Sequence, residues 1–386
     1  MSKGRGTAAS ICFLLTSLDY GGAETQVISL AARLKERGWT VRVISMIAPE
    51  AWLDTLEAHQ IEYASLNMRR GFPDVRGLLR LLILLRRWRP NVLHCHMVHA
   101  NLLGRIARLF VSVPVVISTA HNIDEGGRLR ELAYRITDKL ADITTNVSQA
   151  AVNRYIEVGA APANRIRYLP NGLDTNRFRR DGATANSIKT ELGLGDLFVW
   201  LAIGRMQVEK DYPCMLHAFA AVQGQMKTVL LIAGRGPDEA KIKALAKELG
   251  LAEKVSFLGV RPDIPRLMNV ADAYVMSSAW EGLPMVLLEA AATELPVVTT
   301  DVGGSSDVVI DGRTGFVVEP KNPQRLAEAM ARIMKMPDTR RCEMGALGRR
   351  HVERCFGLDR VVDDWEGLYE EFLSRKGVVA KPVTVV

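Results

Sequence analysis

Two glutamates flank a proline-marked loop in the stretch Ser277–Gly304, SSAWEGLPMVLLEAAATELPVVTTDVGG. The apolar run before Glu281 predicts a buried strand, and Pro284 suits the first turn of a helix. Glu281 therefore belongs in a strand-to-helix loop, and Glu289 deeper in the helix. Backbone amides around Leu283–Val286 are then free donors at a helix N-terminus, a natural phosphate site. A carboxylate farther along can accept hydrogen bonds from a ribose diol. The alternative interpretation is a helix cap and a solvated glutamate.

A second candidate loop is AIGRMQVEKDY, where a strand ends at Gly204 and two cations follow. Arg205 can bind a diphosphate with two hydrogen bonds, and Lys210 can act on it as a point charge. A solvated loop explains the same pair without a ligand. The later segment LLIAGRGPDEAK places Gly234 and Gly236 after another strand. It lacks the third glycine of a dinucleotide fingerprint, so a tight turn is the better interpretation and a nicotinamide dehydrogenase is disfavoured.

The first half of the chain contributes three weaker candidates. In LDYGGAETQ, Gly21–Gly22 lie between a strand and a helix, where backbone can approach a ligand closely. In STAHNID, His121 ends a strand and could bond a sugar hydroxyl, although a structural histidine is the commoner case. The segment VLHCHMVH resembles a metal site, but strand alternation sends His94 and Cys95 to opposite faces, so no metal is expected.

These residues are held by a repeated alternation of strands and helices. Short apolar strands such as ICFLLTSL and NVLHCH alternate with helical patterns, and the series restarts at LFVWLAIG after a polar stretch at Asp181–Asn186. The pattern predicts an α/β protein with two Rossmann-like, doubly wound parallel-sheet domains. Ligands of such sheets bind beyond the carboxyl ends of the strands, and we expect the two domains to face each other across a ligand cleft.

The composition indicates the cellular compartment of the protein and its relation to membranes. The 386 residues carry a net charge of +7, and the five cysteines are scattered without a C-x-x-C pair, which favours a reducing cytoplasm over a disulfide framework. No apolar run is long enough to cross a bilayer. The basic, apolar segment Val75–Pro90, VRGLLRLLILLRRWRP, suits both a membrane-surface helix and a sheet-covering helix with one wet side. The second interpretation is slightly favoured.

Taken together, the motifs resemble glycosyltransferase family 4, retaining enzymes with the two-domain GT-B fold. The resemblance covers nearly the whole chain through GGAE, HN after a strand, LPNGLD, GRMQVEK, GRGPDE and EGLPMVLLEA. The last holds the E-x7-E of that family as Glu281 and Glu289. HN and VEKDY depart from the commoner HD or HG and KGxD. The family also implies that the final helix returns to the first domain, giving residues 1–180 with 359–386 as the acceptor-side domain and 181–358 as the nucleotide-sugar domain.

The resemblance implies roles for single residues. Arg205, Lys210, Glu281 and His121 would carry catalysis, with Arg205 and Lys210 on the donor diphosphate and His121 near the reacting carbon. Glu289 would bind the ribose, and the base would lie near Gly259–Arg261. The implied donor-binding set, drawn from both domains, is Gly22, Gly204, Arg205, Lys210, Arg261, Gly282, Leu283, Pro284, Met285, Val286 and Glu289.

The implied activity is transfer of a hexose or N-acetylhexosamine from a nucleotide sugar, preferably UDP-linked, to a glycan or lipid-linked acceptor in cell-surface polysaccharide synthesis. Attack on the same face of the sugar, helped by the leaving phosphate, needs no metal and no cofactor. The enzyme is expected in the cytoplasm, with peripheral contact to anionic membrane at the inner face and no nucleic-acid partner. Two alternatives stay open: a non-hydrolysing sugar-nucleotide epimerase, and a non-catalytic two-lobed sugar-binding protein.

Overall fold

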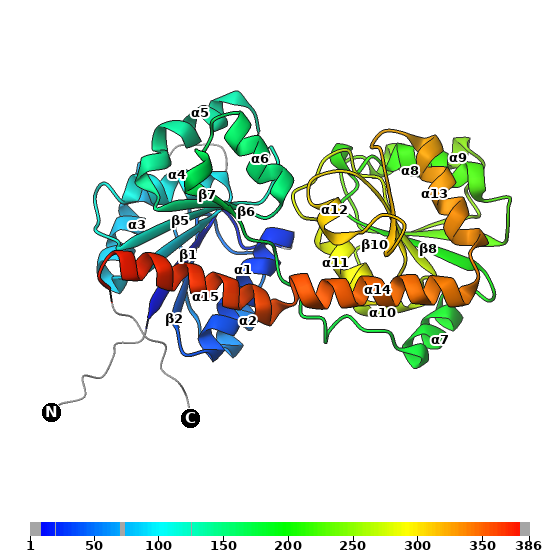
Figure 1. Ribbon diagram of the computed structural model, residues 1–386, viewed down its shortest axis with the longest axis horizontal. Coiled ribbons are helices and arrows are strands. Elements are labelled where there is room, and N and C mark those ends of the chain that lie inside the picture. Colours follow the sequence, from blue (N-terminus) through cyan, green and yellow to red (C-terminus); the bar gives the residue numbers. More distant parts are fainter. Residues whose placement is uncertain (1–8, 20, 70–73, 125, 379–386) are drawn as a thin grey trace. The chain divides into compact units, whose positions relative to one another are not determined.

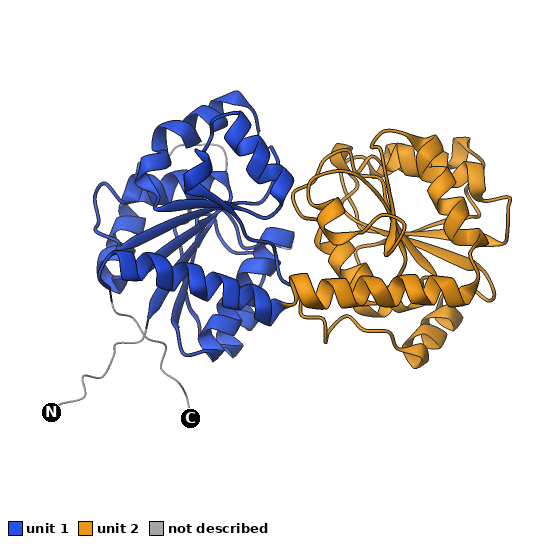
Figure 2. Ribbon diagram, in the orientation of Figure 1, with its two compact units in different colours: residues 1–172, 358–386 blue, residues 173–357 orange. Residues whose placement is uncertain are grey.

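The computed structural model describes residues 9–19, 21–69, 74–124 and 126–378. The chain divides into two compact units (Figure 2). Unit 1 contains residues 1–172 and 358–386, and unit 2 contains residues 173–357. Each unit is a parallel sheet covered by helices on both faces, as the alternation of apolar strands and helices predicts (Figure 1).

The sheet of unit 1 has seven strands in the order β3-β2-β1-β4-β5-β6-β7, and every neighbouring pair is parallel. This is the doubly wound arrangement, in which the strand order reverses between β1 and β4. The strands are β1 (Ser10–Leu15), β2 (Thr40–Ser45), β3 (Glu62–Ser65), β4 (Val92–His96), β5 (Val115–Ala120), β6 (Ile143–Asn146) and β7 (Ile166–Tyr168).

Two apolar layers sandwich this sheet. One lies under α1, α2 and α15, and its core runs from Phe13 on β1 to Trp365 and Tyr369 on α15. The other lies under α3 and α4, where Leu81 and Leu85 pack on Cys95. The helices of unit 1 are α1 (Gly22–Glu36), α2 (Leu53–Ala58), α3 (Val75–Trp88), α4 (Val98–Ala107), α5 (Arg128–Thr137), α6 (Gln149–Glu157) and α15 (Leu358–Arg375).

Unit 2 repeats the plan with six strands in the order β10-β9-β8-β11-β12-β13. Its strands are β8 (Phe198–Ile203), β9 (Thr228–Ala233), β10 (Val255–Gly259), β11 (Ala273–Met276), β12 (Val297–Thr300) and β13 (Gly315–Val318). Helices α8 and α13 pack together over one face, and α11 and α14 over the other. The helices are α7 (Gly182–Glu191), α8 (Tyr212–Val222), α9 (Glu239–Glu248), α10 (Ile264–Val270), α11 (Met285–Ala292), α12 (Ser305–Val308), α13 (Pro323–Lys335) and α14 (Asp338–Phe356).

The domain boundaries differ in detail from the sequence-based ones. The first unit ends at Gly172, so the boundary expected at residue 180 falls inside unit 2. The polar stretch Asp181–Asn186 is not a linker: Asp181 accepts a hydrogen bond from the Ala183 amide and caps α7, which the weak apolar pattern had hidden. The final helix belongs to unit 1, the placement that the family resemblance implies. Over the described residues, no helix is long and apolar enough to cross a membrane.

Candidate active site

The predicted ligand residues of unit 2, apart from Arg261, belong to the segments that follow two neighbouring strands. Strands β8 and β11 pair directly, and the order of the sheet reverses between them. Gly204 follows β8, and Glu281 lies in the loop between β11 and α11. The crevice outside such a reversal is where doubly wound sheets bind their ligands. The two loops singled out from the sequence are therefore adjacent, although 71 residues separate Lys210 from Glu281.

An ion pair joins the two loops. Lys210 Nζ lies 2.5 Å from Glu281 Oε1, and the side chains are 20% and 13% exposed. Ser278 Oγ donates to the same oxygen at 2.7 Å, and the Ala279 amide donates to the Glu209 carbonyl. A carboxylate that already faces an ammonium group and a hydroxyl is a poor free nucleophile. Lys210 and Glu281 instead place an ammonium group and a carboxylate side by side at the carboxyl ends of β8 and β11.

Glycines allow the backbone of the β8 loop to pass its neighbours closely. A Cβ on Gly234, whose φ is +132°, would collide with the Gly204 carbonyl, and one on Gly236 would collide with the Met206 carbonyl. The GRG segment at residues 234–236 thus passes directly against the loop at residues 204–206. The two glycines are required by this close backbone approach, as in the tight turn expected from the sequence. The Lys210 chain covers Gly204, with Cε 3.4 Å from the position of a Cβ there.

Gly303 fixes the loop before α11 in the same way. Gly303, at φ +54°, packs so closely on the Glu281 and Gly282 carbonyls that a Cβ would overlap both. The next amide, that of Gly304, donates to the Gly282 carbonyl at 2.7 Å. These contacts support Gly282 and the run Leu283 to Val286 at the start of α11. Pro284 occupies the N-cap position, where no side chain of the described part of the chain accepts a hydrogen bond, as an anion-binding helix start requires.

Glu289 sits in the second turn of α11 and is half-buried. Burial raises the pKa of its carboxyl to about 7, and Arg177 partly opposes this rise. A carboxyl with few solvating partners gains from accepting hydrogen bonds from two neighbouring hydroxyls. The side chain therefore suits the ribose role that the resemblance implies.

The two remaining cations of the predicted set differ from each other. Arg205 is exposed and follows Gly204 directly, so its guanidinium can reach a ligand at the end of β8. Arg261 instead forms two hydrogen bonds with Asp263, at 2.8 and 2.7 Å, and lies 3.7 Å from Glu191. Its guanidinium is thus held at the start of α10, so contact with a base there would come from its backbone or follow release of Asp263.

In unit 1, the Gly22 loop is held by a buried glutamate. Glu24, which is 7% exposed, accepts a hydrogen bond from Ser17 Oγ at 2.8 Å. A Cβ on Gly21 would collide with the Glu24 carboxylate, so this glycine is required by the fold. Gly22 itself is exposed and begins α1, which leaves its backbone open to a ligand. In the GGAE motif, Gly21 and Glu24 therefore hold the local structure, and the exposed backbone of Gly22 can be approached by a ligand.

His121 follows β5 directly and is buried. Its Nε2 lies 3.0 Å from Nδ1 of His96, the last residue of β4. Burial lowers the pKa of His121 to about 4, so the ring is neutral near pH 7. His94 points away from Cys95, as the strand alternation predicts: it contacts Trp365 and Tyr369 on α15, whereas Cys95 packs against α4.

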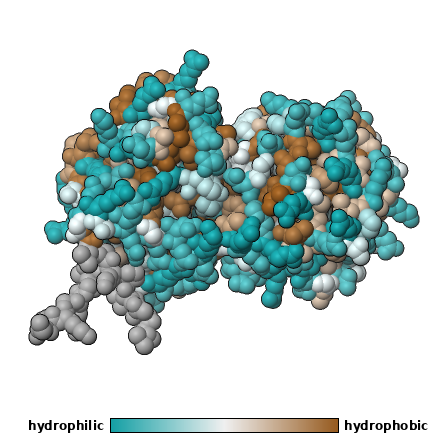
Figure 3. Space-filling model, viewed as in Figure 1, coloured by the Kyte–Doolittle hydropathy of each residue, from teal (hydrophilic) through white to brown (hydrophobic). Residues whose placement is uncertain are grey.

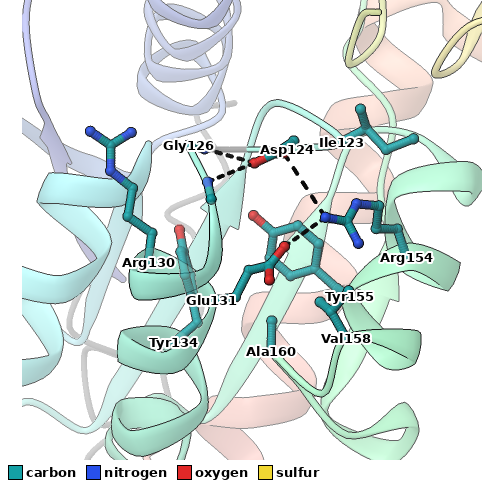
Figure 4. A pocket seen from close by; sticks show the side chains of 11 residues that line it. Ile123, Asp124, Gly126, Arg130, Glu131, Tyr134, Arg154, Tyr155, Val158 and Ala160 are labelled. Carbon is teal, nitrogen blue, oxygen red and sulfur yellow. Dashed lines mark hydrogen bonds and ion pairs between the residues drawn. The ribbon is translucent and has the colours of Figure 1, made fainter.

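The loop after His121 is fixed by an acidic cap and an arginine (Figure 4). Asp124 accepts hydrogen bonds from the Gly126 and Gly127 amides, which lower the pKa of its carboxyl. Arg154 on α6 lies 2.7 Å from Glu131 and 3.9 Å from Asp124. These side chains line a small hollow between α5 and α6. The hydrogen bonds and ion pairs around the hollow therefore hold the segment after His121 in place. The hollow itself is too small for a sugar substrate.

Three residues of this arrangement were not assigned a role from the sequence. Ser278 follows the apolar run before Glu281 that predicts a strand, and nothing in the local sequence marks its hydroxyl as a partner of Glu281. Gly303 stands out as half of a glycine pair, but its contact is tertiary. His96 lies in VLHCHMVH, where the sequence suggests no role other than that of a metal ligand. The signal that could have found it is its placement at the end of the strand next to that of His121.

Comparisons with known proteins agree with this geometry. The family model for glycosyl transferases group 1 matches residues 186–350, and the model for glycosyltransferase family 4 matches residues 20–177. The two matches fall in unit 2 and mainly in unit 1, respectively. Together they cover most of the chain.

Relatives and solved structures lead to the same family. A GDP-mannose-dependent alpha-(1-6)-phosphatidylinositol monomannoside mannosyltransferase of Mycobacterium tuberculosis is 30% identical over 264 residues, 65% of this chain and 68% of that protein. A UDP-Gal:alpha-D-GlcNAc-diphosphoundecaprenol alpha-1,3-galactosyltransferase of Escherichia coli is 26% identical over 78% of this chain and 81% of that protein. The crystal structure of Anabaena Alr3699/HepE in complex with UDP matches with a TM-score of 0.83 at 22% identity, over 94% of this chain and 100% of that one. The chain therefore belongs to glycosyltransferase family 4 and is a sugar-transferring enzyme with the GT-B fold.

Proposed function

We propose that the enzyme transfers a hexose or N-acetylhexosamine, with retention of the anomeric configuration, from a UDP-sugar to a lipid-linked glycan in cell-surface polysaccharide synthesis. The observation that carries the donor half of this proposal is the cluster at the ends of β8 and β11. There, Lys210, the N-terminus of α11 and the half-buried Glu289 offer partners for a diphosphate and a ribose.

The charges at this cluster favour departure of the nucleotide. Breaking the anomeric bond leaves negative charge on the diphosphate, which Arg205, Lys210 and the α11 amides stabilise. Since these groups supply the positive charge, we expect turnover to continue in EDTA. Glu281 is held by Lys210 and Ser278, so we assign it to orienting the lysine and the donor sugar.

The acceptor proton then goes to the leaving phosphate, which lies on the same face as the incoming hydroxyl. Retention follows because attack and departure share that face. An anomeric product of inverted configuration in a one-dimensional NMR time course, or a sugar trapped covalently on Glu281, would contradict this mechanism.

The acceptor half rests on the surface of unit 1. Helix α3 buries Leu81, Leu82, Leu85 and Trp88 against the sheet, as a sheet-covering helix must. Its outer side is apolar as well as basic: Val75, Leu79 and Ile83 are 70%, 54% and 62% exposed and recur every fourth residue. The exposed arginines of α3 lie beside this row, and the helix contains no acidic residue.

The patch extends past α3. Arg86 donates to the Phe110 carbonyl at 3.1 Å, which brings Leu109 and Phe110, 62% and 56% exposed, next to the helix. Figure 3 shows hydrophobic areas among hydrophilic side chains on the visible face of unit 1. A helix with apolar and cationic residues on its outer side suits an anionic lipid surface. We therefore place the enzyme at the inner face of the membrane, where a lipid-linked acceptor is available.

A donor panel tests the proposal. We expect UDP-glucose, UDP-galactose or UDP-GlcNAc to raise the unfolding temperature and to release UDP slowly in the absence of acceptor. The Mycobacterium tuberculosis relative is named for GDP-mannose, so that donor belongs in the panel. If GDP-mannose alone stabilised the enzyme against heat, the nucleotide of the proposed donor would be GDP and not UDP. A response to none of the four would remove the proposed donors, and epimerisation of a nucleotide sugar without acceptor would favour the epimerase instead.

A further inference from the structure

Two serines follow β11, and the first of them, Ser277, holds the loop that carries Lys210. Its side chain is fully buried. The Ser277 hydroxyl lies 2.8 Å from the Lys210 carbonyl oxygen and 2.9 Å from that of Asp211. A hydroxyl has one proton to donate, so the two carbonyls share it. Two residues on, the Ala279 amide donates to the Glu209 carbonyl at 2.7 Å. This short segment therefore holds three successive carbonyls of the lysine loop.

The backbone is left-handed at the point where Ser277 holds it. Lys210 ends a 3₁₀ helix (Val208–Lys210), and Asp211 follows with φ +44° and ψ +49°. Residues with a Cβ disfavour this region, although aspartate tolerates it better than most. In helical conformations of either hand, successive carbonyls point to the same side, so this turn presents both carbonyls to one hydroxyl. The hydroxyl therefore stabilises a turn that the chain would otherwise adopt reluctantly.

The direction of the Lys210 side chain depends on this turn. Its Nζ reaches Glu281 Oε1 at 2.5 Å, and its aliphatic part passes over Gly204. Ser277 and Glu281 both belong to the loop after β11, so one loop holds the lysine at its backbone and at its ammonium group. The four-carbon stem of a lysine is flexible, so its charge has a fixed place only when both ends are held. A cation stabilises a departing diphosphate best when it is in place beforehand.

We propose that Ser277 is a positioning residue whose hydroxyl holds the turn at Lys210 and Asp211 and so sets the ammonium group of Lys210 where the donor diphosphate binds. Ser277 acts through the lysine and does not touch the donor, because its side chain is fully buried and its proton is engaged by backbone carbonyls. The effect on sugar transfer rests on the proposed function. The effect on the place of the lysine does not.

The place of Lys210 can be followed without any donor. Acetic anhydride acylates lysine amino groups more slowly when they are paired or partly buried, and peptide mass spectrometry reads each lysine separately. We expect Ser277→Ala to raise the acylation rate of Lys210 about 2- to 10-fold, the weight of one neutral hydrogen bond. Lys241, whose side chain is 84% exposed, is the internal reference. An unchanged rate at Lys210 would overturn the proposal.

A double-variant cycle tests whether Ser277 acts through Lys210. With the donor that the panel selects, Ser277→Ala should lower kcat/KM about 2- to 10-fold in the wild-type background. In Lys210→Met no ammonium group is left to place, so adding Ser277→Ala should change kcat/KM by less than about 2-fold. A purely structural role would lower kcat/KM by the same factor in both backgrounds, and that result would contradict the inference.

Thr228→Val is the matched control. The Thr228 hydroxyl is buried and donates to the Phe198 carbonyl at 2.8 Å. These two residues begin β9 and β8, so they lie at the opposite end of the sheet from Lys210. The variant should lower the unfolding temperature as Ser277→Ala does, but leave Lys210 acylation and kcat/KM at the wild-type level. Equal losses of transfer in the two variants would mean that any lost buried hydroxyl has this effect.

The outcomes separate this inference from the proposed function. If no donor of the panel is turned over but Lys210 acylation rises in Ser277→Ala, the proposed function fails and the positioning role stands. If transfer proceeds and Ser277→Ala matches the wild type in acylation and in kcat/KM, the inference fails and the proposed function stands. If Ser277→Ala does not fold, Ser277→Cys, whose thiol is a weak donor, decides by the same measurements.

Discussion

The ion pair between Lys210 and Glu281 gives a sharp test, because one substitution affects stability and catalysis for different reasons. In Lys210→Met, Ser278 is the one side-chain hydrogen-bond partner that the described part of the chain leaves to the Glu281 carboxylate. Exposed ion pairs contribute about 0–1 kcal/mol, and breaking a fully buried pair costs about 3–5 kcal/mol. With side chains 20% and 13% exposed, we expect the free energy of unfolding to fall by about 2 kcal/mol.

The effect on transfer is separate from this loss. A hydrogen bond from a charged donor is worth about 1.5–3 kcal/mol, so losing the one from Lys210 to the departing diphosphate should lower kcat/KM about 10- to 150-fold. Urea unfolding and initial rates of nucleotide release measure the two quantities. Lys241→Met is the matched control, because Lys241 pairs with Asp238 at 3.1 Å but is 84% exposed. It should change neither quantity appreciably.

The double variant Lys210→Met with Glu281→Gln decides between the two causes. It leaves no uncompensated charge, so stability should return to within about 1 kcal/mol of the wild type, while transfer stays impaired. The reasoning is refuted if transfer recovers together with stability, since the lysine would then act only as a structural partner of Glu281. It is equally refuted if Lys210→Met matches the wild type in kcat/KM.

Three further predictions concern separate parts of the chain. Because the pKa of Glu289 is raised from 4.5 to about 7, the folded state holds this proton more tightly, and stability should fall by up to about 3 kcal/mol as pH rises from 4.5 to 7; urea titrations of Glu289→Gln should lack this fall. Gly303→Ala should destabilise unit 2 by more than about 2 kcal/mol and impair donor binding, whereas Gly312→Ala, at φ +69° with open space around it, should cost only about 1 kcal/mol of backbone strain. Ile83→Glu should abolish flotation with phosphatidylglycerol vesicles and leave donor turnover intact, whereas Val260→Glu, 73% exposed in unit 2, should float like the wild type.

Each of these predictions has a result that counts against it. An unchanged pH profile in Glu289→Gln would mean that another group titrates in that range. Equal losses in the two glycine variants would show that the contact of Gly303 with the Glu281 loop carries no special cost. Binding of Ile83→Glu to anionic vesicles at the wild-type level would move the membrane contact away from α3.

Most of the fold was predictable because its strands are buried on both faces and read as continuous apolar runs. The strand that the sequence did not reveal is β3, a four-residue edge strand, EYAS, with exposed positions and no apolar run. Helix α7 was missed for a related reason. It buries only Ile188 and carries little apolar periodicity, so its first turn resembled a polar linker.

The site was predictable as a set of residues but not as a set of contacts. The local pattern of an apolar strand followed by a polar loop places Arg205, Lys210 and Glu281 at the carboxyl ends of strands. It does not say where those strands lie in the sheet. That Lys210 pairs with Glu281 depends on β8 being the neighbour of β11, which is a property of the strand order. The same holds for His96 and His121, whose bond requires β4 and β5 to be adjacent. Long-range pairing of this kind leaves no local trace in the sequence.

Helix α15 has a consequence for how the chain is made. It supplies Val361, Trp365, Tyr369 and other side chains to a core whose first strand is β1. A nascent polypeptide emerges from the ribosome in order, so every residue of unit 2 is available before α15 is. During translation, α1 and α2 can already pack on this face of the sheet, but the apolar part that α15 covers stays exposed until the later unit has been made. We expect a chain that ends before Leu358 to leave this apolar surface of unit 1 exposed and to be prone to aggregation.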